Sequence, residues 1–221
     1  MSTETTDKKP RQKQEYRYLS VGQLKAKKYD TIDLGERFRE LFGIIQTKFV
    51  IMVYGPSGCG KSVMVLELCQ ELSKHGKVLY NSHEEQDNMT LQDRENNFKI
   101  DSSKITFGVS VPFPEMVRKI KTGHYSYAVI DSVQFMALTY DQLKELKELS
   151  KRKKKFGIIM VSRGDAKYKP KNAIEHLHAC DVKGYMKNGY IDVESRYLSA
   201  DVRKQIFRPQ QVNTANQPTL F

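Results

Sequence analysis

Gly55-Pro56-Ser57-Gly58-Cys59-Gly60-Lys61-Ser62 identifies the class of fold to which this chain belongs. The run 49–54 before it is apolar throughout and of strand length, as expected for a strand buried on both faces of a parallel sheet. The run 61–75 after it carries apolar residues at helical spacing and ends before Gly76. The order of strand, glycine-rich loop and helix predicts an α/β protein with a phosphate-binding loop.

The residue types in this loop suit a nucleoside triphosphate. Glycines let the main chain wrap closely around phosphate oxygens, and the helix N-terminus adds positive partial charge. Lys61 is expected to reach the β- and γ-phosphates, and the Ser62 hydroxyl to ligate Mg²⁺. The predicted nucleotide-binding residues are Gly55, Pro56, Ser57, Gly58, Cys59, Gly60, Lys61, Ser62 and Val63.

Composition limits the class of protein. A chain of 221 residues is long enough for one α/β domain with a sizeable core. Its 37 Lys and Arg against 26 Asp and Glu indicate either a polyanionic partner or simply a well-solvated basic surface. The three cysteines form no CxxC pair, which favours a reducing compartment. The polar N-terminus and the lack of a membrane-length apolar run predict a cytoplasmic protein without a membrane partner.

Charge and periodicity divide the chain into three parts. We expect a flexible basic arm over residues 1–30, a folded core over 31–200 and a polar tail over 201–221. In the core, strands and helices alternate, which predicts a mainly parallel twisted sheet flanked by helices. The turn Asn188-Gly189 between two apolar runs predicts a C-terminal antiparallel hairpin. Strands are expected at 77–82, 105–111, 127–131 and 156–161, and helices at 86–97, 112–121 and 141–155 and within 32–45, where the helix ends at Gly43.

Acidic residues follow two of the predicted strands. Asp131 ends the apolar run 127–130, where a carboxylate beside a phosphate loop can hold a Mg²⁺-bound water; the alternative is a carboxylate that caps a turn. Glu84 and Glu85 follow the strand that ends at Ser82. One of them can orient the attacking water as general base, although two adjacent acids also suit a solvated helix start.

Two arginines and two histidines late in the chain have alternative roles. Arg163 and Arg196 each follow a predicted strand, and either can stabilise charge on a transferring phosphoryl group or simply face solvent. His176 and His178 are two residues apart, which does not put both on one helix face. We therefore predict structural histidines and no metal site there.

The succession of GPSGCGKS, VLYNSHEEQ, YAVIDSVQ, GIIMVSRGD, IEHLHACDV and VESRY resembles the RecA-type ATPase core, most closely the RadA/Sms branch of bacterial recombination proteins, over about residues 31–198. The resemblance implies that Lys61 and Glu84 are catalytic, that Asp131 holds Mg²⁺, and that Gln134 senses the γ-phosphate or couples to DNA. It implies an inter-subunit role for Arg196, although Glu194 and Ser195 replace the branch's Lys and Asn. The branch's zinc module and protease-like domain are absent from this sequence, which suggests a stand-alone core of phage or mobile-element type.

In this superfamily, loops after core strands bind DNA. Here one such loop carries basic residues beside Tyr168, a combination that suits single-stranded nucleic acid; they are Arg163, Lys167, Lys169 and Lys171. The basic helix end 151–155 either contacts DNA or interacts favourably with the helix C-terminus.

The resemblance predicts an ATP- and Mg²⁺-dependent homo-oligomeric ATPase, stimulated by DNA and acting in recombination, repair or replication. One alternative is an ATP-gated loader that regulates a replication or recombination partner and has little DNA affinity of its own. A small-molecule kinase on the same core is a third.

Overall fold

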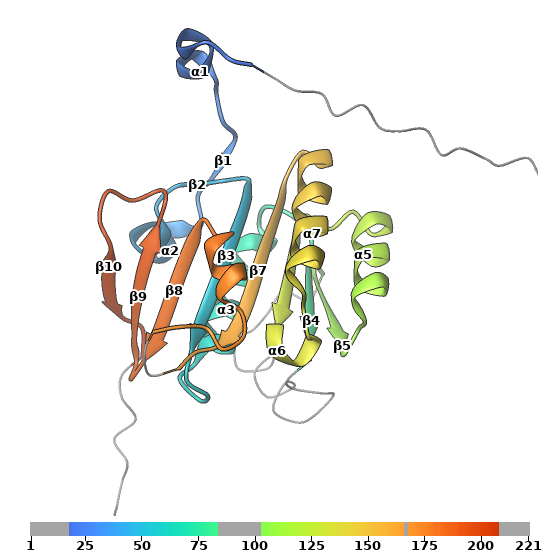
Figure 1. Ribbon diagram of the computed structural model, residues 1–221, viewed down its shortest axis with the longest axis vertical. Helices are drawn as coiled ribbons and strands as arrows, with labels where there is room; N and C mark the ends of the chain where they lie inside the picture. The colour runs from blue at the N-terminus through green and yellow to red at the C-terminus, as the bar shows by residue number, and fades with distance from the viewer. Residues whose placement is uncertain (1–17, 84–102, 166–167, 208–221) are drawn as a thin grey trace, which may run out of the picture.

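A computed structural model describes residues 18–83, 103–165 and 168–207. Within these ranges the chain forms an eight-stranded sheet in the order β10-β9-β8-β3-β7-β6-β4-β5 (Figure 1). Neighbouring strands from β8 to β5 are parallel, and β9 is antiparallel to both β8 and β10. The strands are β3 (Lys48–Gly55), β4 (Val78–Ser82), β5 (Ile105–Val109), β6 (Tyr127–Asp131), β7 (Phe156–Arg163), β8 (Val182–Lys187), β9 (Tyr190–Ser195) and β10 (Val202–Gln205). The predicted fold class, a mainly parallel sheet with a C-terminal antiparallel hairpin, is confirmed.

Helices cover both faces of the sheet (Figure 1). Buried side chains of α2 (Gly35–Phe42) and α3 (Lys61–Ser73) belong to one apolar cluster, and those of α5 (Phe113–Thr122) and α7 (Tyr140–Arg152) to a second. The central strand β3 contributes Ile51 and Val53 to the first cluster and Val50 and Met52 to the second. This alternation explains why the run is apolar at every position, because a strand between two helical layers is buried on both faces. Two short helices, α6 (Val133–Met136) and α8 (Ile174–His178), complete this part of the chain.

The carboxyl ends of the parallel strands meet at one edge of the sheet. In the register, Gly55 of β3 lies opposite Arg163 of β7, and Asp131 of β6 lies between Ser82 of β4 and Val161 of β7. The phosphate loop (residues 55–62), Asp131 and the residue pair 82–83 are therefore gathered at this edge, which is where open α/β sheets bind ligands.

The N-terminal part differs from its prediction in detail. Helix α1 (Val21–Ala26) has no buried residue and stands away from the body of the protein (Figure 1). The helix expected within 32–45 ends at Gly43 as predicted but begins only at Gly35, because residues 31–32 form strand β1 (Thr31–Ile32), which pairs with β2 (Ile45–Gln46). The predicted helix 86–97 lies outside the described residues.

Strand β10 lies inside the region 201–221, for which the sequence predicted a tail. It pairs with β9 along four residues, from Val202 opposite Val193 to Gln205 opposite Tyr190. Its side chains are intermediate or exposed, so backbone hydrogen bonds to β9, and not an apolar pattern, hold it at the edge of the sheet. The sheet therefore continues beyond the predicted boundary at residue 200.

Candidate functional site

The phosphate loop joins β3 to α3 through glycines that no other residue could replace without strain. Gly60 is the N-cap of α3 with φ 91°, in the left-handed region, and its carbonyl accepts the bond from Met64 N at 3.0 Å. A Cβ on Gly55 would lie 2.1 Å from the carbonyl oxygen of Met186 in β8. The close packing of Gly55 against β8 and the left-handed turn at Gly60 place the loop amides at the start of α3, where they can bind an anion.

Lys61 is the first residue of α3 and is only 6% exposed. Its Nζ donates to the carbonyl of Pro56 at 2.7 Å, so the amino group lies against the phosphate loop. There it is predicted to bind phosphate together with the loop amides. A buried ammonium group satisfied by a neutral carbonyl is well suited to exchange that partner for a phosphate oxygen.

Asp131 ends β6 and is 4% exposed. The Tyr80 hydroxyl in β4 donates a hydrogen bond to its Oδ2. Burial raises the pKa of the Cys69 thiol in α3, and the nearby Asp131 carboxylate raises it further. The carboxylate therefore lies on the face of the sheet covered by α3, the helix that starts at the phosphate loop.

Ser62 and Asp131 suit Mg²⁺ by their chemistry, since both offer hard oxygen donors. The described residues contain no group of three or more His, Cys, Asp or Glu that could hold a metal ion. The assignment of Mg²⁺ to Ser62 and Asp131 and the structural roles of His176 and His178 stay predictions.

Gln134 connects the Asp131 edge to the end of β7. It lies in α6, and its Nε2 donates to Ser162 Oγ at 2.8 Å and to the carbonyl of Lys171 at 2.6 Å. Its Oε1 accepts from the amide of Arg163 at 3.0 Å. The side-chain amide of Gln134 thus bonds to the end of β7 and to both ends of the segment 163–171.

That segment, which we call the basic hairpin, folds back on itself after β7. The Lys171 amide donates to the Arg163 carbonyl at 2.7 Å, and Gly164 and Pro170 form an antiparallel bridge. The Arg163 guanidinium lies 4.7 Å from the centre of the Phe135 ring. Lys169 and Lys171 are exposed, as is Tyr168, whose ring lies 4.3 Å from that of Tyr185. Lys167 lies outside the described residues.

The predicted catalytic carboxylate also lies outside the described residues, together with Glu85. The last described residue before Glu84 is His83, whose amide donates to the carbonyl of Asp131 at 2.5 Å. Its Nε2 lies 3.1 Å from the carbonyl of Val111. The chain therefore arrives at residue 84 from beside Asp131, while the role of Glu84 stays a prediction.

Arg196 lies at the opposite edge of the sheet from the phosphate loop of its own chain. Its Nη1 pairs with Asp181 Oδ1 at 3.0 Å, and Asp181 Oδ2 accepts from the amide of Val50 at 2.8 Å. From Val50, β3 runs five residues further to Gly55, which is about 17 Å of strand. The side chain is 65% exposed and is not brought together with Lys61 or Asp131.

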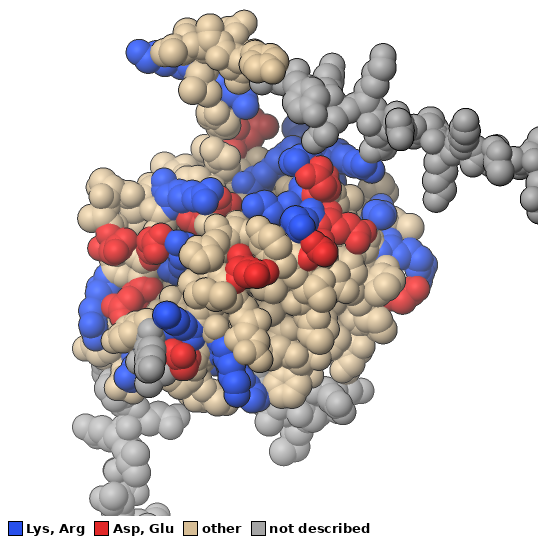
Figure 2. All heavy atoms as spheres, in the orientation of Figure 1, with Lys and Arg blue, Asp and Glu red and all other residues tan. Residues whose placement is uncertain are grey.

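Two lysines of the basic helix end 151–155 bond to main-chain carbonyls. Lys153 Nζ donates to the carbonyls of Tyr125 at 2.9 Å and Ile120 at 3.3 Å, and Lys155 Nζ to that of His75. Figure 2 shows Lys and Arg side chains gathered over this end of α7, mixed with acidic ones. The two alternatives for this helix end, contact with DNA and interaction with the helix C-terminus, both stay predictions.

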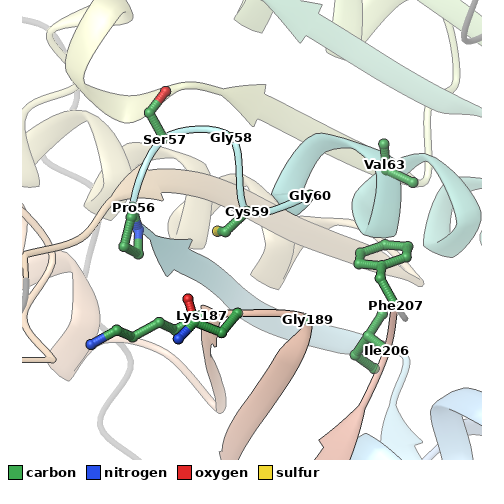
Figure 3. A pocket seen from close by; sticks show the side chains of 11 residues that line it. Pro56, Ser57, Gly58, Cys59, Gly60, Val63, Lys187, Gly189, Ile206 and Phe207 are labelled. Carbon is green, nitrogen blue, oxygen red and sulfur yellow. The ribbon is translucent and has the colours of Figure 1, made fainter. Parts of the chain in front are cut away.

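One wall of the site was missed from the sequence. A cavity of about 920 Å³ lies between the phosphate loop and the C-terminal strands (Figure 3). Besides the loop and Val63 it is lined by Lys187, Asn188, Gly189, Ile206 and Phe207. The Asn188-Gly189 turn was predicted, but its position beside the loop depends on β8 lying next to β3. Nothing in the local pattern of Ile206 and Phe207 indicates a site.

Comparisons with known proteins agree with this architecture. The family model of the AAA domain matches residues 47–169. A search of curated proteins found no relative. One similar solved structure is the KaiC-like protein PH0186 from the hyperthermophilic archaeon Pyrococcus horikoshii OT3, at 15% identity and TM-score 0.54; the match covers 80% of this chain and 93% of that one. Another is the flagellar accessory protein FlaH from Methanocaldococcus jannaschii, at 15% identity and TM-score 0.57; this match covers 82% of this chain and 95% of that one. At these identities the likeness is one of fold. Across the described ranges, no helix has the length and apolar character needed to cross a membrane.

Proposed function

This chain belongs to the AAA domain family and has a RecA-like P-loop ATPase fold, and we propose that it is a Mg²⁺-dependent ATPase that acts on DNA in recombination, repair or replication. The observation that carries the proposal is the hydrogen bonding of Gln134, which links the Asp131 edge of the nucleotide site to both ends of the basic hairpin. A change at the γ-phosphate that moves Gln134 must alter the hairpin, and the reverse also holds.

Each predicted residue has a distinct role in hydrolysis. The loop amides and Lys61 would hold the β- and γ-phosphates and stabilise the charge that develops on them. Ser62 and Asp131 would hold the Mg²⁺, which neutralises phosphate charge when bound. Glu84 would orient and deprotonate the attacking water, as the resemblance to the RadA/Sms branch implies.

The basic hairpin is the proposed contact with single-stranded DNA. Its exposed Lys169 and Lys171, with Arg163 and Lys167, would contact phosphates, and the exposed Tyr168 would offer a ring on which a base can stack. The contact between the Tyr168 and Tyr185 rings, and the bond from the Tyr185 hydroxyl to the carbonyl of Asp165 at 3.1 Å, support the hairpin from β8.

We also propose that the chain works as a homo-oligomer in which Arg196 acts on the nucleotide of a neighbouring subunit. Its distance from its own phosphate loop and the 65% exposure of its side chain support a role in trans, for which the guanidinium would exchange its present partner Asp181 for a phosphate. A cytoplasmic location is part of the same proposal, supported by three cysteines that are all free thiols.

The test is ATP hydrolysis with and without single-stranded DNA. We expect DNA to raise the rate, Lys61→Ala to abolish hydrolysis, and Lys169→Ala combined with Lys171→Ala to remove the stimulation. The matched control replaces Lys119 and Lys121 by Ala, two cationic residues exposed on α5 away from the hairpin. An ATPase that no DNA or RNA stimulates would overturn the role on DNA and leave the nucleotide site intact.

Helix α1 favours a second candidate function, an ATP-gated module that loads or regulates a DNA-processing partner. Its Val21 and Leu24 are 70% and 53% exposed, and the preceding Leu19 is 39% exposed. A six-residue helix with no buried side chain is marginal on its own in water, so a partner would stabilise it. Affinity capture from the host extract with and without ATP separates the two functions, because a gated module must change its partners with nucleotide.

A further inference from the structure

One side of the cavity beside the phosphate loop is formed by apolar side chains (Figure 3). Val63 lies just inside α3, and Ile206 and Phe207 follow β10 (Figure 3). The sequence and the comparisons assign no role to Ile206 or Phe207. Both side chains are partly buried and pack against the apolar cluster that contains α3.

The end of β10 is held in this position by the turn between β8 and β9. The amides of Ile206 and Phe207 both donate to the carbonyl of Gly189, at 2.7 and 3.1 Å. The Phe207 ring lies directly on the phosphate loop, since a Cβ on Gly60 would be 2.5 Å from its Cε2. The ring therefore both lines the cavity and packs against the residue at which α3 begins.

A nucleotide bound by its phosphates at residues 55–62 must direct its nucleoside part away from Lys61, which is buried behind the loop. The cavity is lined by the loop, by the turn 188–189 and by Phe207, and its volume of about 920 Å³ exceeds that of a nucleoside. An aromatic face flanked by two aliphatic side chains suits a flat heteroaromatic ring, which gains both apolar burial and stacking.

We propose that Phe207 is the residue on which the base of the bound nucleoside triphosphate stacks, with Ile206 and Val63 beside it. This rests on the proposed function only so far as a nucleoside triphosphate binds at the phosphate loop. The substrate class is purine nucleoside triphosphates, because a purine covers more of the ring face than a pyrimidine does. Removal of the ring weakens binding through the base and leaves the phosphate contacts unchanged.

The absence of tryptophan from the sequence allows a direct test. In the full-length Phe207→Trp variant the single indole would stack on the base, so its fluorescence is expected to be quenched by ATP and GTP, less by CTP, and not by tripolyphosphate. The matched control is Tyr140→Trp, a 37%-exposed position on α7. It is expected to show no quenching with any of these ligands.

Affinity measurements complete the test. Phe207→Ala is expected to weaken ATP binding by about tenfold or more, as for other lost base-stacking contacts, with no change in the competition constant of tripolyphosphate. Phe207→Leu, which keeps apolar bulk on Gly60, should show a similar loss, and Phe207→Tyr should restore binding. Equal weakening of ATP and tripolyphosphate in both Phe207→Ala and Phe207→Leu, or no loss for ATP in either, would overturn the inference.

The two levels of failure are distinguishable. If neither ATP nor tripolyphosphate binds the wild-type chain, or if binding survives Lys61→Ala unchanged, the proposed nucleotide site itself is wrong. If ATP binding depends on Lys61 but the indole at position 207 is not quenched, the nucleotide site stands and the role of Phe207 is wrong.

Discussion

The side-chain amide of Gln134 donates a hydrogen bond to the main-chain carbonyl of Lys171 at 2.6 Å. Their positions differ by 37 along the chain, with one residue in the helix after Asp131 and the other at the end of the basic hairpin. Such a bond between the two segments is a physical route by which the state of the nucleotide can reach a nucleic-acid contact.

Gln134→Glu tests this coupling with a side chain of nearly the same shape. A carboxylate cannot donate to the Lys171 carbonyl, so two acceptors would face each other in place of the present bond. We expect the ratio of DNA-stimulated to basal ATPase rate to fall about tenfold. The measurement is steady-state hydrolysis across a DNA titration. An unchanged ratio in a folded variant would show that the hairpin is coupled by another route.

Lys61→Ala removes the buried ammonium group of the phosphate loop. We expect loss of hydrolysis by at least about a hundredfold, because a charged donor to the transferring phosphoryl group is lost. Circular dichroism and urea unfolding check that the variant is folded. Activity close to that of wild type would place the reaction at another site.

Gly60→Ala is expected to destabilise the protein even without nucleotide. The residue has φ 91°, and a Cβ would lie 2.5 Å from the Phe207 ring. We expect a loss of about 1–3 kcal/mol in the free energy of unfolding. In the double variant with Phe207→Ala the clash disappears while the backbone strain remains, so only part of the loss from Gly60→Ala should persist. Strictly additive losses would mean that the ring can move aside freely.

Buried His176 predicts a pH dependence of stability. Burial lowers its pKa, partly offset by backbone groups of Thr139 and Leu138. The folded state therefore binds this proton less readily than the unfolded state, and the free energy of unfolding should decrease as the pH falls through about 6.5, the ordinary pKa of histidine. His176→Phe should reduce that slope in urea unfolding measured at about pH 7.5 and about pH 5.5, on either side of that value. The exposed His178, changed to Gln, is the control and should leave the slope unchanged.

Arg196 predicts complementation between inactive variants. If it acts on a neighbour's nucleotide, Arg196→Ala keeps an intact phosphate loop and Lys61→Ala keeps an intact arginine. Mixing the two should then restore part of the ATPase rate that each lacks alone. Mixtures that stay inactive, at concentrations where size-exclusion chromatography shows mixed oligomers, would contradict a role in trans.

The fold class and the phosphate loop could be predicted from local sequence. The apolar run of β3, the glycines of residues 55–62 and the helical period after Lys61 predict their own structure, because each depends on neighbours in the chain. The same holds for the hairpin around Asn188 and Gly189, where the turn residues select the conformation.

The meeting of distant residues could be seen only in the folded chain. Arg196 and Phe207 both come late in the sequence, yet the antiparallel course of β9 carries Arg196 to the far edge of the sheet, and β10 returns Phe207 to the phosphate loop. Strand β10 has no apolar pattern of its own, and Gln134 meets Lys171 only because β6 lies beside β7. Strand order and direction arise from packing and backbone pairing across the whole sheet, which the period of a single segment does not encode.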